Sequence, residues 1–177
     1  MRVLMLSWEY PPNVAGGLGR HVAELSPALV QQGLELHLIT PTTKAETAQV
    51  TVENGVTVHR VLTPIMGVEA IDIYSQAIEA NALLKAYALS LPALYGPYDL
   101  IHVHDWLTGF AGLALKKAWQ CPLVTTIHAT ERGRARGYLR NPLQWAIDEA
   151  ERQLIDQSDV DHAEGIFKQL GHLRRLR

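Results

Sequence analysis

The sequence predicts an α/β protein built on a doubly wound, mostly parallel β-sheet. Apolar runs of about five residues, typical of buried strands, alternate with longer segments that carry an apolar face at helical spacing. Parallel strands need crossover connections, and helices usually supply them. Only residues 49–52 and 56–61 are close enough to pair as a hairpin. The sequence therefore favours a parallel sheet with one β-hairpin insertion.

Each element follows from a local signal. Strands are expected at residues 2–7, 34–40, 100–104 and 123–127, and helices at 18–32, 71–91, 107–119 and 141–156. Gly33 is expected to stop the first helix and Pro92 to end the second, whereas Pro142 suits the first turn of the last helix. The dipeptide Asn54-Gly55 favours a primed turn, which predicts the hairpin.

Composition indicates a small globular domain. The 177 residues are 47% hydrophobic and 19% charged, with a net charge of −2, which gives no support for nucleic-acid binding. The lone Cys121 excludes an internal disulfide and a cysteine-based metal cluster. No apolar window approaches the roughly 20 residues of a membrane span, and Met1 runs directly into a strand. A cytoplasmic protein without a transmembrane segment is expected.

Gly16 and Gly17 lie between the first strand and the first helix, which begins at Leu18. Glycines there let a ligand approach backbone N–H groups, and the helix dipole favours an anion such as a phosphate. The third glycine of a dinucleotide fingerprint is missing and no acidic residue follows Thr40, which disfavours a dehydrogenase; no P-loop is present either. A plain loop closed by Pro11-Pro12 is the alternative.

Polar side chains follow three of the predicted strands. The first strand leads into Glu9, the strand at 100–104 into His104-Asp105-Trp106, and the strand at 123–127 into His128-Ala129-Thr130. Ligands of open parallel sheets bind beyond the carboxyl ends of the strands. Three such sequences at one sheet edge predict a site.

Each of these residues also has a structural alternative. Asp105 could cap the following helix, His128 could be satisfied by backbone groups, and Trp106 could pack rather than hold a sugar. His21 could be a surface residue, and His102 is expected in the core. His104, Asp105 and His128 match no known spacing of zinc ligands, so no metal is expected.

Three motifs now support a resemblance: Ser7-Trp8-Glu9-Tyr10-Pro11-Pro12 with Gly16-Gly17-Leu18-Gly19, His102-Val103-His104-Asp105-Trp106-Leu107-Thr108-Gly109, and Thr125-Thr126-Ile127-His128. Together they resemble the N-terminal half of the glycogen synthase and starch synthase-like glycosyltransferases, families 4 and 5 of the GT-B superfamily. The resemblance covers residues 1–159. It implies a Rossmann-like acceptor-side domain that faces a second, donor-binding domain across a cleft.

The resemblance also implies roles for the candidate residues. Gly16 and Gly17 would offer amides to the donor diphosphate, Asp105 would bind sugar hydroxyls, and His128 would contact the transferring sugar near its reacting carbon. Further substrate or donor contacts are expected from Leu18, Glu9, His104, Trp106 and Thr130. Transfer in the family retains anomeric configuration and uses an ADP-, UDP- or GDP-sugar as co-substrate, with no metal or other cofactor.

Two departures from the family pattern narrow the assignment. Starch-type enzymes carry Lys-x-Gly-Gly, whereas this chain has Asn13-Val14-Ala15 before the glycines, which favours family 4. At the other end, Asp161-His162 is expected to break the next strand, and residues 160–177 are expected to form an atypical basic tail, helical or disordered. The donor-binding domain would then be absent, as in a truncated gene or an excised domain.

The sequence thus predicts the N-terminal domain or a truncated form of a retaining hexosyltransferase that transfers a sugar, glucose being the first candidate, to a glycan or another hydroxyl acceptor. A separately encoded donor domain is a candidate partner. The alternative is a catalytically inactive carbohydrate-binding or partner-binding module.

Overall fold

A computed structural model describes residues 1–163 except residues 48 and 65. The strands are β1 (Arg2–Ser7), β2 (Glu35–Thr42), β3 (Val50–Glu53), β4 (Val56–Leu62), β5 (Leu100–His104), β6 (Leu123–Ile127) and β7 (Val160–Ala163). The helices are α1 (Gly17–Gln31), α2 (Ile73–Tyr95), α3 (Gly109–Trp119), α4 (Glu131–Arg134) and α5 (Pro142–Gln157), with short 3₁₀ turns at Ala45–Thr47 and Trp106–Thr108. The predicted strand–helix alternation is confirmed.

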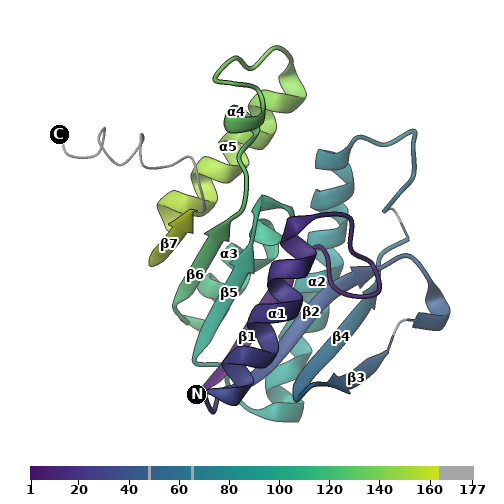
Figure 1. The fold of residues 1–177 in the computed structure, drawn as a ribbon, viewed down its shortest axis with the longest axis vertical. Helices are drawn as coiled ribbons and strands as arrows, with labels where there is room; N and C mark the ends of the chain where they lie inside the picture. The colour runs from purple at the N-terminus through teal and green to yellow at the C-terminus, as the bar shows by residue number, and fades with distance from the viewer. Residues whose placement is uncertain (48, 65, 164–177) are drawn as a thin grey trace.

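The strands form one sheet in the order β3-β4-β2-β1-β5-β6-β7 (Figure 1). Every neighbouring pair is parallel except the β3–β4 hairpin. Asn54 and Gly55 both have positive φ, as the predicted primed turn requires. The strands β2, β4 and β3 lie on one side of β1, and the later strands β5, β6 and β7 follow in order on its other side. The topological switch point therefore lies between β1 and β5, where Ser7 is in register with His104.

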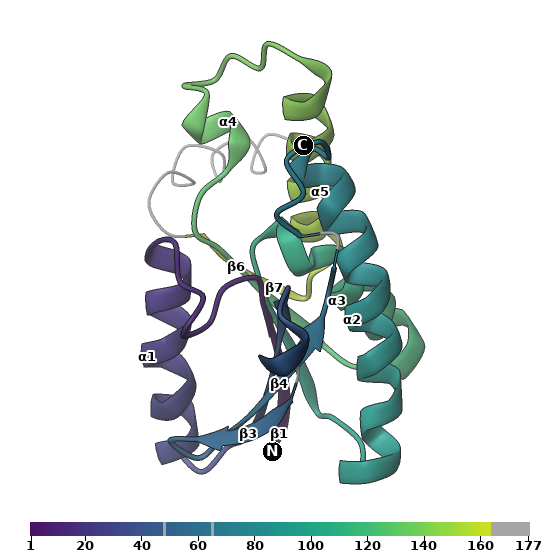
Figure 2. The ribbon, with the colours of Figure 1, turned by 90° about the vertical axis from the view of Figure 1, so that its right-hand side faces the viewer.

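The two faces of the sheet are covered unequally. Helix α1 packs on one face, and α2, α3 and α5 pack on the other (Figure 2). Alternation along each strand divides the core accordingly: Val3 and Met5 of β1 pack toward α1, whereas Leu4 and Leu6 pack toward the α2 and α3 side. Both faces are apolar because both are buried, as in other parallel sheets.

Two predicted breaks are absent from the structure, and β2 continues beyond its predicted end at Thr40 to Thr42. Helix α2 continues through Pro92 to Tyr95. Proline in this last turn removes a single N–H donor, the Pro92 carbonyl still accepts from Gly96, and Leu91 is buried beside it. Packing therefore outweighs the local break.

The predicted break at Asp161-His162 is also wrong, because residues 160–163 form β7 and pair in parallel with β6. Pairing at a sheet edge depends on backbone groups, so an edge strand tolerates polar residues. The rest of the predicted basic tail, residues 164–177, lies outside the described residues.

Candidate functional site

The polar segments predicted from the sequence meet at the carboxyl edge of the sheet, beside the switch point. The glycine loop after β1 begins α1, β5 ends at His104, and the segment after β6 carries His128. Rings from all three segments are in contact: His21 of α1 lies 5.7 Å from His104 and 4.9 Å from His128, measured between centroids. His21 is therefore half-buried against the other two rings.

The glycine loop presents backbone N–H groups at the start of α1, and Glu9 already occupies part of it. One carboxylate oxygen of Glu9, Oε2, accepts from the amides of Ala15 and Gly16, both at 3.0 Å. Gly17 is the first helical residue, and the amides of a first helical turn have no acceptor within the helix. A Cβ added at Gly16 or Gly17 would meet nothing within 4 Å, so this end of the helix is open to a ligand.

Gly19, by contrast, is required by packing. A Cβ there would lie 3.0 Å from Cβ and Oε2 of Glu9 and from Cγ1 of Val14. The loop that carries Glu9 can fold onto α1 because Gly19 has no side chain. The glycines of this segment thus differ in their roles. Gly19 allows the loop to pack against α1, whereas Gly16 and Gly17 leave the start of the helix open to a ligand.

His104 and His128 are joined directly. Nδ1 of His104 lies 3.1 Å from Nε2 of His128, and the rings are stacked at 24°. His104 is fully buried, His128 is half-buried, and Nε2 of His104 has no hydrogen-bond partner among the described residues. Burial is the main cause that lowers the pKa of His104 well below its usual value, so the ring is neutral. His102 lies on the same face, with Nε2 2.9 Å from Oγ1 of Thr126.

Asp105 positions His128 rather than capping the following turn. Its side chain makes no cap hydrogen bond; instead Oδ1 accepts from the backbone N–H of His128 at 2.7 Å. Asp105 is 5% exposed, and burial raises the pKa of its carboxyl to about 6 despite that hydrogen bond. The cap alternative is wrong, and the carboxyl is close to half ionised near pH 6.

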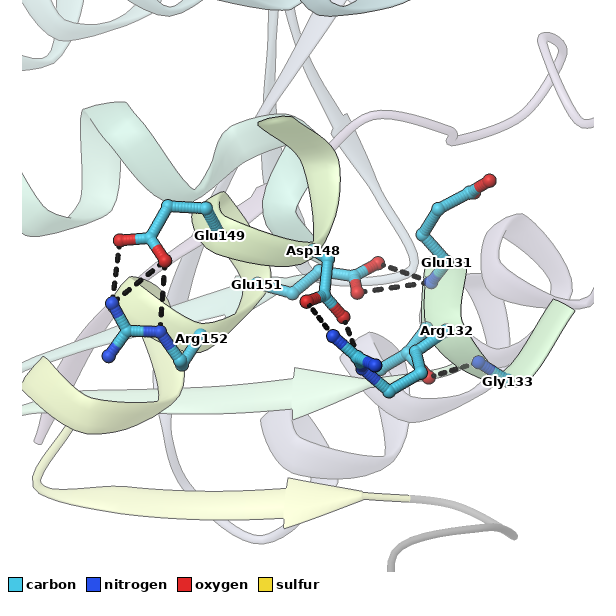
Figure 3. A network of polar contacts seen from close by, with 8 residues as sticks. Glu131, Arg132, Gly133, Asp148, Glu149, Glu151 and Arg152 are labelled. Atoms are coloured by element: carbon cyan, nitrogen blue, oxygen red, sulfur yellow. Dashed lines mark hydrogen bonds and ion pairs between the residues drawn. The ribbon is translucent and has the colours of Figure 1, made fainter. Parts of the chain in front are cut away.

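The segment after His128 is tied to α5 (Figure 3). Both carboxylate oxygens of Glu151 accept from the backbone N–H of Glu131, at 2.9 and 3.0 Å. Arg132 pairs with Asp148 through two hydrogen bonds of 2.9 and 2.6 Å. Burial raises the pKa of Glu151 to about 8. These contacts hold the segment after His128, and Asp105 holds the N–H of His128 itself.

Three residues predicted as substrate contacts have buried side chains in the structure. Trp106 is 4% exposed and stacks on Tyr74 within an apolar cluster of α2 and α5, so its ring offers no face to a sugar. Thr130 is buried and its Oγ1 accepts from the N–H of Gly133, which makes it the cap of α4. The side chain of Leu18 packs beneath α1, which leaves only its backbone N–H for a ligand.

His21 and Glu151 are the site residues that the motifs did not single out. His21 could have been found from helical spacing. It lies three residues after Leu18, and residues three apart share a helix face, so His21 would be expected to face the sheet as Leu18 does. Glu151 gave a weaker signal, because an acidic residue in an amphipathic helix usually faces water.

Comparison with known proteins now identifies the chain. The model of "Glycosyltransferase Family 4" matches residues 15–161. The chain belongs to this family. Its curated relatives include a glycogen synthase of Mycobacterium tuberculosis, 34% identical over 171 residues, which cover 90% of this chain and 41% of the relative. A D-inositol 3-phosphate glycosyltransferase of Kribbella flavida is 37% identical over 136 residues, 72% of this chain and 31% of that protein.

Solved structures agree on the fold. A sucrose-phosphate synthase from Thermosynechococcus elongatus superposes with a TM-score of 0.75 at 20% identity, over 99% of this chain and 45% of that one. The chain therefore has the fold of one half of a GT-B glycosyltransferase and spans about two-fifths of the first relative. Among the described residues, no helix is long and apolar enough to cross a membrane.

Proposed function

We propose that this chain forms the acceptor-side half of a retaining glycosyltransferase, which transfers a hexose from a nucleotide sugar to a glycan or another hydroxyl acceptor. One observation carries the proposal: an open helix N-terminus and a fixed histidine, His128, meet at the switch point of a parallel sheet. Ligands of such sheets bind at this place. Family membership supplies the reaction class.

Each group has a distinct part in the proposed reaction. The amides of Gly17 and Leu18, at the positive end of α1, would hold the donor diphosphate as it leaves. Gly16 would join them once Glu9 releases its N–H group. His128 would contact the transferring sugar, where positive charge develops at the ring. Asp105 would hold His128 in position through the backbone and also bind sugar hydroxyls.

Glucose is the proposed sugar, and the donor base remains open among adenine, uracil and guanine. The names of the relatives differ in the substrates that they imply, which is why the donor base is left open. One is named a glycogen synthase, and others are named D-inositol 3-phosphate glycosyltransferases. Val14 stands where starch-type enzymes have the lysine of Lys-x-Gly-Gly, which supports the family 4 pattern over the starch type.

A matched pair of substitutions tests the diphosphate contact. Gly17→Asp fits sterically and suits a first helical turn, but its carboxylate would repel a diphosphate; Gly17→Ala is the neutral control. Titration of both variants and the wild type with ADP-, UDP- and GDP-glucose should perturb the amide resonances of Gly17, Leu18 and His128 in wild type and Gly17→Ala only. Absence of any perturbation in the wild type at saturating ligand would refute the proposal.

Activity of residues 1–177 alone is a separate question. We expect weak sugar binding and no detectable transfer. A second domain would hold the reactants together and close the cleft against water, and such effects lower the reaction barrier by roughly 7–11 kcal/mol. Labelled glycan formed from ADP- or UDP-glucose by the purified chain would contradict this expectation. A carbohydrate-binding or partner-binding module is the competing function. Transfer after co-expression with a donor domain would exclude it.

A further inference from the structure

His21, His104 and His128 form a cluster with the composition of a transition-metal site. The three rings come from α1, from the end of β5 and from the segment after β6. One ligand nitrogen from each ring lies within 4.8 Å of the other two. Neutral imidazole nitrogens are ligands for Zn²⁺ and its neighbours, whereas Mg²⁺ and Ca²⁺ require oxygen ligands.

The spacing of the first two ligands already suits a metal ion. Nδ1 of His104 and Nε2 of His128 are 3.1 Å apart. Two nitrogens bound tetrahedrally to one Zn²⁺ at about 2.0–2.1 Å are separated by roughly 3.3–3.4 Å. An ion could therefore replace the hydrogen bond between these rings with little movement. His21 would complete the set by a modest shift of its side chain on α1.

Burial decides how an ion would reach this site. His104 is fully buried, and the nitrogen that would bind the ion is Nδ1, which faces Nε2 of His128. His21 and His128 are half-buried, which gives an ion access from the sheet edge and leaves a fourth position for water.

The surroundings of the cluster would support a cation. Asp105 does not compete as a ligand through Oδ1, because that oxygen accepts the backbone N–H of His128. Carboxylates just outside a metal site commonly orient the ligands and balance the charge of the ion. The zinc set considered from the sequence included Asp105; in the structure, His21 takes that place.

We propose that His21, His104 and His128 bind one Zn²⁺ with water as the fourth ligand. The site is inhibitory rather than catalytic, since the ion holds the ring of His128 that the sugar would contact. This inhibitory consequence rests on the proposed function, whereas the metal site itself does not.

The test is calorimetric titration of the 177-residue chain with Zn²⁺, without any sugar. We expect one ion per chain, and a loss of at least about tenfold in affinity in His21→Ala and in His128→Asn, because removal of even an outer partner costs 10–100-fold. Arg20→Ala, an exposed neighbour on the same helix, should bind as the wild type does. The proposal would be overturned if the wild type did not bind Zn²⁺, or if both histidine variants bound it with the affinity of the wild type.

A second measurement on the wild type keeps the test independent of how the variants fold. Co²⁺ in place of Zn²⁺ should give the intense visible absorption of a tetrahedral site and should shift the ring resonances of His21, His104 and His128. Shifts confined to other histidines would place the ion elsewhere and refute the site. Either result leaves the test with nucleotide sugars unaffected, so the two proposals fail separately.

Discussion

Two groups of histidines lie on opposite faces of one sheet, and they differ in how the surrounding protein uses their nitrogens. On the α2 side, the His37–His59 pair is buried, and Nδ1 of His37 is 3.0 Å from both Nε2 of His59 and the hydroxyl of Tyr98. Nδ1 of His59 is 3.0 Å from the hydroxyl of Tyr87, and Nε2 of His37 is 3.6 Å from Glu35. Three of the four ring nitrogens of this pair are thus within hydrogen-bonding distance of a partner, and the fourth lies near a carboxylate.

The cluster at the carboxyl edge is different. His104 is just as buried but keeps one nitrogen without a partner among the described residues, and its neighbours His21 and His128 are half-buried. Histidines next to each other are therefore not evidence of a site by themselves. A closed network of hydroxyl partners makes them part of the core, whereas an incomplete network at a sheet edge makes them available to a ligand.

The largest expected effect is on catalysis at the edge. His128→Ala, in a full-length family 4 enzyme that carries this domain, should lower turnover about 100–1000-fold, equivalent to ~2.7–4 kcal/mol, with a change of only about 1 kcal/mol in unfolding free energy. Initial rates and urea unfolding measure the two quantities. Retention of more than about a tenth of the wild-type rate would contradict the assigned role.

The same change in the closed pair should act on stability instead. His59→Ala leaves a cavity and removes the partner of both His37 and Tyr87, so unfolding free energy should fall by roughly 2–4 kcal/mol. The affinity for nucleotide sugars at the carboxyl edge should stay within about twofold of the wild-type value. The substituted residue lies on the other face of the sheet, and the variant is expected to remain folded. A loss of binding without a loss of stability would reverse the comparison.

Acid should also weaken the protein through its buried histidines. Burial lowers the pKa of His59 to about 4 and lowers the pKa of His37, while both titrate near 6.5 when unfolded. The unfolded state then binds more protons, so unfolding free energy should fall by on the order of 1–3 kcal/mol between pH 6.5 and 4 and level off below. His104 contributes in the same direction. Urea unfolding of the wild type and of His59→Gln, repeated between pH 6.5 and 4, measures how steeply the unfolding free energy depends on pH. This dependence should be weaker in the variant, and an identical dependence would exclude the pair as its source.

A smaller effect isolates one hydrogen bond of the closed network. Tyr87→Phe keeps the ring and removes only the hydroxyl that meets Nδ1 of His59, so stability should fall by about 1 kcal/mol. Thermal unfolding of this variant provides the measurement, with Tyr138→Phe, the same change at a side chain that is 75% exposed, as control. No loss of stability would show that the network is not closed in the way described.

Much of the fold could be predicted from the sequence because local patterns decide it. The strands at 100–104 and 123–127 have the predicted bounds, and Asn54-Gly55 forms the predicted turn. The errors lie where tertiary contacts override a local signal. Pro92 stays within a helix that packing holds, and residues 160–163 pair with β6 despite their polar sequence.

The site was predictable in position more than in detail. Strand-end motifs placed His104, Asp105 and His128 at one edge, since parallel strands end together. They could not tell that Trp106 faces the core, that Glu9 reaches the amides of Ala15 and Gly16, or that His21 joins the histidines. Those contacts depend on how α1 and α2 sit against the sheet, which the helical period alone does not fix.

The comparison of the two clusters is tested most directly by NMR of the histidine rings in the wild-type chain during a titration with ADP-glucose and UDP-glucose. The account predicts that ring resonances of His128, and with it His104 and His21, shift with the bound fraction, while those of His37 and His59 do not move. Shifts confined to His37 and His59, or none at saturating ligand, would contradict the claim that the edge cluster is the functional one.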